Sequence, residues 1–200
     1  WYDDAASLCR ALQEAGVADD TVPGILGRSL AATGRLTDAL DVLEAAIQAA
    51  PDRWEGHADL ADVVVAAMTH GAGELGPRRA ANGADGAVRP SASAVAQLLP
   101  LDATRKALCA SLPEPPAGDP WALLASTARE RAQAAVDLAP GAPAVARLQV
   151  RMAVAPLLVA LRGQRLPDEV LDALTHDAGE LAERLAQQAQ RDPYVACGLL

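Results

Sequence analysis

Residues 21–51 read TVPGILGRSLAATGRLTDALDVLEAAIQAAP, and their spacing is typical of paired helices. Leu26 and Leu30 are four residues apart, so a helix places both on one face. Gly34 permits a turn after this first helix, because glycine adopts left-handed backbone conformations without strain. Pro51 ends the second helix, since proline cannot continue it. The stretch therefore predicts two antiparallel helices joined by a short turn.

Small and aliphatic residues follow the inner faces of these two predicted helices. Gly27 is small enough to let a partner helix approach closely. Ala39, Leu43 and Ala46 form the inward stripe of the second helix at i, i+4 and i+7 spacing. Thr37 is expected to cap the second helix by accepting a hydrogen bond from a backbone N–H.

Together these positions resemble a tetratricopeptide repeat, a unit of about 34 residues that folds into two antiparallel helices. Pro23 stands where the family usually has Trp. The resemblance implies an all-α array of helix pairs, in which the first helix of each pair lines a concave groove that binds peptides or partner helices. Little catalysis by the array itself is implied.

The same frame partly repeats in both directions along the chain. One repeat earlier it predicts a helix with Ala5, Cys9 and Leu12 on its inner face. One repeat later it predicts a helix over residues 54–67. The frame then fails at Pro77, where it would require a further helix.

Gly-Pro, Asn-Gly, Asp-Gly and Arg-Pro pairs gather in residues 76–118, a composition typical of a linker. Within it only residues 91–99 and 102–112 have the length and apolar spacing of short helices. The sequence therefore predicts tetratricopeptide-like repeats in residues 1–75, an irregular inserted linker in 76–118, and a second tetratricopeptide-like helical region in 119–200.

Three more helices are expected after the linker. The first starts at Asp119-Pro120, with an Asp cap and Pro at the first helical position, and runs to Ala139. The others span residues 143–161, with a bend at Pro156, and residues 175–191. An offset of 89 residues aligns two sets of positions: Ala128, Ala132, Ala135 and Pro140 repeat the spacing of Ala39, Leu43, Ala46 and Pro51.

The composition argues against several classes of function. A net charge of -9 gives no electrostatic attraction to nucleic acid or to an anionic membrane. The longest apolar run of the C-terminal half, residues 152–161, is about half of what a membrane span needs. The three cysteines are far apart and form no C-x-x-C motif, which indicates neither a disulfide framework nor a structural zinc site. We therefore expect a cytoplasmic protein.

The resemblance also implies which side chains face the groove. These are Arg28 on the first complete repeat and Glu55, Asp59 and Asp62 on the next. Because acidic residues predominate among the four, a protein or peptide partner of basic or mixed charge is expected.

Two short segments offer candidate metal ligands. His70 and Glu74, and likewise His176 and Glu180, are four residues apart and would share one face of a helix. We favour the simpler interpretation, in which each segment starts the second helix of a repeat and Thr69 or Thr175 caps that helix. A G-x-G-x-x-G match at residues 71–76 lacks the strand and helix that dinucleotide binding requires, so no cofactor is expected.

These observations favour a non-catalytic interaction module, a scaffold or adaptor taken from a larger bacterial-type polypeptide or assembly. One alternative is a ligand-sensing arm that regulates an attached domain or enzyme. Another is a metal-dependent enzyme that uses the two His/Glu pairs. The apolar helix faces at the ends of a short array also favour self-association.

Overall fold

The computed structural model describes residues 1–17, 19–70, 97–98, 120–161 and 168–191, and this part of the chain contains α-helices and no β-strand. The all-α prediction is confirmed. The helices are α1 (Tyr2–Glu14), α2 (Val22–Ala32), α3 (Leu36–Ala49), α4 (Trp54–His70), α8 (Pro120–Leu138), α9 (Pro143–Leu161) and α10 (Asp168–Arg191). None of the helices described has both the length and the hydropathy that crossing a membrane requires.

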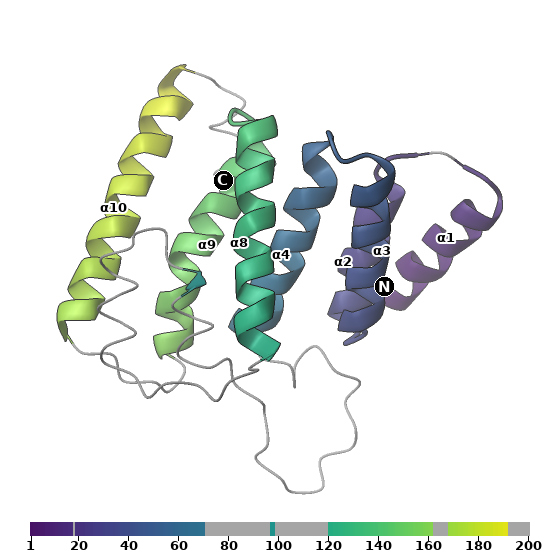
Figure 1. Ribbon diagram of the computed structural model, residues 1–200, viewed down its shortest axis with the longest axis horizontal. Coiled ribbons are helices and arrows are strands. Elements are labelled where there is room, and N and C mark those ends of the chain that lie inside the picture. Colours follow the sequence, from purple (N-terminus) through teal and green to yellow (C-terminus); the bar gives the residue numbers. More distant parts are fainter. Residues whose placement is uncertain (18, 71–96, 99–119, 162–167, 192–200) are drawn as a thin grey trace, which may run out of the picture.

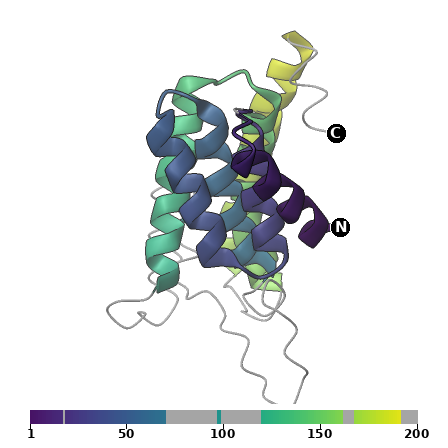
Figure 2. The same ribbon diagram turned by 90° about the vertical axis from the view of Figure 1, so that its right-hand side faces the viewer.

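The helices stand beside one another along the long axis of the molecule, from α1 at one end to α10 at the other (Figure 1). Seen from the α1 end, α1 lies obliquely in front of the rest (Figure 2). α2 packs against α1, α3 and α4, whereas α4 also packs against α3, α8 and α9. α9 in turn packs against α10. α4 is therefore the central helix.

The turn between α2 and α3 is closed by backbone hydrogen bonds around a glycine. Gly34 has a φ of +83°, in the left-handed region that favours glycine. Its N–H donates to the carbonyl of Ala31 over 2.9 Å, and the N–H of Arg35 donates to the carbonyl of Leu30 over 2.9 Å. These two bonds form a Schellman motif, and the prediction of a turn at Gly34 is confirmed.

Thr37 does not cap α3, contrary to the sequence-based prediction. α3 begins at Leu36, its N-cap residue is Arg35, and no side chain hydrogen-bonds to its first N–H groups. The Schellman turn returns the chain to helical geometry at Leu36, which leaves Thr37 inside the first turn. An ion pair between Arg35 and Asp38 spans that turn instead.

Thr175 does not cap a helix either, and Thr69 lies near the end of α4, while the helix that it was predicted to start falls outside the described residues. The Thr69 hydroxyl donates to the carbonyl of Val65 over 2.9 Å near the end of α4. The Thr175 hydroxyl donates to the carbonyl of Leu171 over 2.8 Å inside α10. In both cases the helix has already begun upstream, so the hydroxyl bonds back to the preceding turn.

α2 and α3 pack closely because Gly27 has no side chain. A Cβ atom at this position would lie 2.6 Å from Cγ of Leu43, so the leucine fills the space above the glycine. Leu26 and Leu30 are buried as predicted, and so is Ala39. Ile47, rather than the half-buried Ala46, completes the buried stripe of α3.

One hydrophobic core connects the helices from α1 to α9, and α10 packs on α9 through a separate small cluster around Ala146 and Leu185. The core extends from Ala6 in α1 to Ala155 in α9, and it includes Leu98. The predicted helix over residues 54–67 is confirmed as α4, which continues to His70. The segments expected as residues 1–75 and 119–200 thus share a core, because α4 packs against both α8 and α9.

The C-terminal helices follow the sequence-based prediction except at one boundary. α8 begins at Pro120 and α9 covers the expected residues with Pro156 inside it. α10 begins at Asp168, seven residues ahead of the expected start at Thr175. Leu171 and Leu174 extend its apolar stripe upstream, and Leu174 is buried. Of the segments 91–99 and 102–112, only residues 97 and 98 lie within the described chain.

The close contact at Gly27 can be tested with one added methyl group. Gly27→Ala should lower the free energy of unfolding by about 1–3 kcal/mol, because Leu43 must shift out of a packed position. Gly179→Ala is the matched control, since Gly179 is exposed on α10 and a Cβ there meets nothing within 4 Å. It should raise stability by about 0.5–1 kcal/mol through helix propensity. Urea unfolding measures both, and an equal effect at the two sites would contradict this packing.

Candidate functional site

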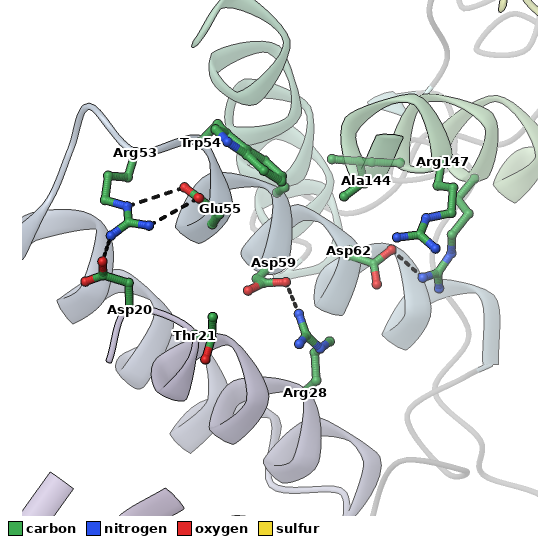
Figure 3. A pocket seen from close by; sticks show the side chains of 13 residues that line it. Asp20, Thr21, Arg28, Arg53, Trp54, Glu55, Asp59, Asp62, Ala144 and Arg147 are labelled. Carbon is green, nitrogen blue, oxygen red and sulfur yellow. Dashed lines mark hydrogen bonds and ion pairs between the residues drawn. The ribbon is translucent and has the colours of Figure 1, made fainter. Parts of the chain in front are cut away.

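A pocket of about 500 Å³ opens where α2, α4 and α9 lie side by side (Figure 3). Its walls combine charged side chains with one indole ring, one hydroxyl and three aliphatic side chains. The lining residues are Asp20, Thr21, Arg28, Arg53, Trp54, Glu55, Ala58, Asp59, Asp62, Ala144, Arg147, Leu148 and Arg151. Such groups bind a ligand through ion pairs, hydrogen bonds and apolar contact.

The structure brings the four predicted groove residues into this one pocket. Glu55, Asp59 and Asp62 recur at i, i+4 and i+7 along α4, so they share a helix face. Arg28 reaches the same space from the neighbouring α2 (Figure 3).

The expected predominance of acid in this region is wrong. Four arginines line the pocket together with four carboxylates. Arg28 pairs with Asp59 across the α2–α4 contact, and Arg151 pairs with Asp62 across the α4–α9 contact. The acidic face of α4 is therefore neutralised by arginines from the helices on either side of it.

Asp59 is the most enclosed carboxylate of the pocket. Its side chain keeps 21% of its exposure, and it lies over Gly24 of α2 in space that any larger residue would occupy. Burial raises the pKa of Asp59 above its ordinary value, and the nearby charges of Asp62 and Glu55 add to this. The Arg28 guanidinium acts in the opposite direction but does not outweigh burial.

A second cluster lies where α2 and α4 begin. Arg53 pairs with Asp20, and its Nη2 atom is 3.2 Å from Oε1 of Glu55. Burial by itself would raise the pKa of Glu55, but hydrogen bonds from Arg53 and from its own N–H, with the Arg53 charge, lower it. Both carboxylates are thus held by one guanidinium.

Arg147 is the pocket arginine that pairs with no carboxylate in the described part of the chain. It is exposed, and it lies one helical turn before Arg151 on α9. Figure 3 shows Arg147 on the same side of the pocket as Asp62.

The pocket continues into an adjoining hollow of about 650 Å³. The two share Arg28, Asp62 and Arg151. Beyond these residues the hollow is lined by Trp1, which precedes α1, and by Tyr2, Ala5, Ile25, Ser29, Ala31, Ala32, Val63 and Ala66. Together they form an elongated groove with a charged part and a more apolar part.

The sequence-based prediction missed Arg147 and Arg151, although a signal for them was present. The offset of 89 residues that relates α3 to α8 also relates α4 to α9, because residues 54–70 then fall on 143–159. In that alignment Arg151 takes the place of Asp62. Applying the same offset to residues 54–70 would have shown that an arginine stands on the helix over 143–161 where Asp62 stands on the helix over 54–70.

The described residues offer no third ligand beside the His/Glu pairs that were considered as a metal site. Nε2 of His176 lies 3.4 Å from Oε1 of Glu180 on the exposed side of α10. Glu74 and the side chain of His70 lie outside the described residues, as do residues 71–76. Among the described side chains, no three of His, Cys, Asp or Glu converge to hold a metal ion.

Comparisons of this chain with protein-family models, with curated proteins and with solved structures found no match.

The environment of Asp59 predicts a pH dependence of stability. Because burial raises the pKa of Asp59 in the folded state, the folded protein binds a proton at this side chain more tightly than the unfolded chain does. The stability gained from that proton is fully present below about pH 3.8 and is lost as the pH rises through the folded pKa. Wild-type protein should therefore lose stability relative to Asp59→Asn between pH 3.8 and neutrality. Urea unfolding across this range measures the difference.

Asp19→Asn is the matched control with the opposite sign. The N–H of Thr21 donates to Oδ1 of Asp19 over 2.8 Å, and the Thr21 hydroxyl adds a second bond, so the pKa of Asp19 is lowered. Wild-type protein should gain stability relative to this variant as the pH rises through the lowered pKa of Asp19 towards 3.8. The same trend in both variants would contradict the burial of Asp59.

Proposed function

We propose that this chain is a non-catalytic helical-repeat module of the tetratricopeptide type, which binds a peptide or a partner helix in the groove formed by α2, α4 and α9. It would act as a scaffold or adaptor within a larger polypeptide or assembly. The observation that carries this proposal is that α2, α4 and α9 together line an open pocket, which shares Arg28, Asp62 and Arg151 with an adjoining, more apolar hollow.

The helix contacts support this assignment. α2 pairs with α3, α4 with α8, and α9 with α10, while α1 packs on α2 as the second helix of a preceding pair would. The first helices also contact one another in sequence, α2 with α4 and α4 with α9. In this interpretation the long insertion falls inside the second pair, between α4 and α8, and the repeat continues after it.

The side chains of the groove support binding of a peptide. Charged and half-exposed groups recur along its length, next to the indole of Trp54 and the apolar hollow near Trp1. An extended peptide or a helix can contact polar and apolar parts of such a groove at once.

Filling the pocket should abolish binding. Ala144 lines the pocket at the start of α9 and is half-buried, so Ala144→Trp places an indole in the ligand's path. Peptides selected from a random peptide display library on wild-type protein should bind this variant at least about tenfold more weakly. Isothermal titration calorimetry measures the affinities.

Ala45→Trp is the control, because Ala45 is exposed on α3 and lies outside the pocket. This variant should bind the selected peptides as wild-type protein does, and thermal unfolding should show both variants folded. If the selected peptides bind all three proteins equally, or if no peptide is selected, the groove is not a peptide site.

A further inference from the structure

The charges of the pocket are balanced in number but separated in space. At the end where α2 and α4 begin, Asp20 and Glu55 share the single guanidinium of Arg53, which leaves one negative charge in excess. In the middle, Arg28 and Asp59 neutralise each other. Figure 3 shows the Arg53 group at one side of the pocket and the Arg28–Asp59 pair between it and Arg147.

The α9 side of the pocket instead has one positive charge in excess. Arg151 is paired with Asp62, whereas Arg147 pairs with no carboxylate among the described residues. The region around Arg147 is therefore positive, and Figure 3 shows it across the pocket from Asp20 and Arg53. Trp54 lies between the two regions and is half-buried against the core.

A ligand gains most when its charges match both regions. A uniformly basic segment would approach Arg147 with like charge, and a uniformly acidic segment would do the same at Asp20 and Glu55. A segment with one charge of each sign can satisfy both excess charges while the existing ion pairs stay intact. The exposure of these groups makes each contact modest in energy.

We infer that the groove takes a peptide segment of mixed charge, bound in a defined direction, with its acidic residue at Arg147 and its basic residue at Glu55 and Asp20. This inference rests on the proposed peptide-binding function and adds the chemistry of the partner. It also narrows the expected partner of basic or mixed charge to one of mixed charge.

Double-mutant cycles between groove and peptide test the direction of binding. The probes are peptides selected from a random display library on wild-type protein, each resynthesised with its acidic residue changed to the amide or its basic residue changed to Gln. The protein variants are Arg147→Gln and Glu55→Gln, with Arg184→Gln as a control, because Arg184 is exposed on α10 and lies outside the pocket.

We expect the acidic peptide residue to couple with Arg147 and the basic one with Glu55, each by about two- to fivefold in affinity. The crossed combinations and the Arg184 control should show no coupling. Both couplings should shrink as salt is raised.

The outcomes separate this inference from the proposed function. If the selected peptides lose binding with Ala144→Trp but show crossed coupling or none, the mixed-charge direction is wrong and the groove remains a peptide site. If no groove-dependent peptide is obtained, both the proposed function and this inference are overturned.

Discussion

The enclosure of α4 constrains the architecture more than any other contact. Four helices pack around it, and Leu60, Ala61 and Val64 have no exposed surface. A helix covered on so many sides needs small or branched aliphatic side chains where its neighbours approach, because protein interiors tolerate neither voids nor overlap. The scarcity of aromatic residues, 2% of the chain, is consistent with this close packing. The positions of α2 and α9 on either side of α4 then define the groove.

Local patterns predicted the helices well because they depend on neighbours within a few residues. The turn at Gly34, the end of α3 before Pro51 and the start of α8 at Pro120 were all legible in the sequence. The family resemblance pointed to Arg28, Glu55, Asp59 and Asp62, and all four line the pocket. The cap predicted at Thr175 failed, since a hydroxyl can serve equally within a helix by bonding to the preceding turn.

The electrostatics of the site could not be predicted in the same way. Asp62 and Arg151 are 89 residues apart, and their pairing exists only because α9 packs against α4. The net charge of -9 describes the whole chain and gives no information about a pocket in which carboxylates and arginines are equal in number. The buried position of Asp59 similarly results from the approach of α2 at Gly24, a contact between helices that no local pattern encodes.

The separation of α4 from α8 along the chain has a consequence for biosynthesis. α1, α2 and α3 can cover one side of α4 as soon as His70 has left the ribosome, since all their contacts are local in sequence. α8 can be completed only when Leu138 has been added, an interval of several seconds at about 5–20 residues per second. A nascent chain that ends before α8 therefore lacks the α4–α8 contacts that complete the core.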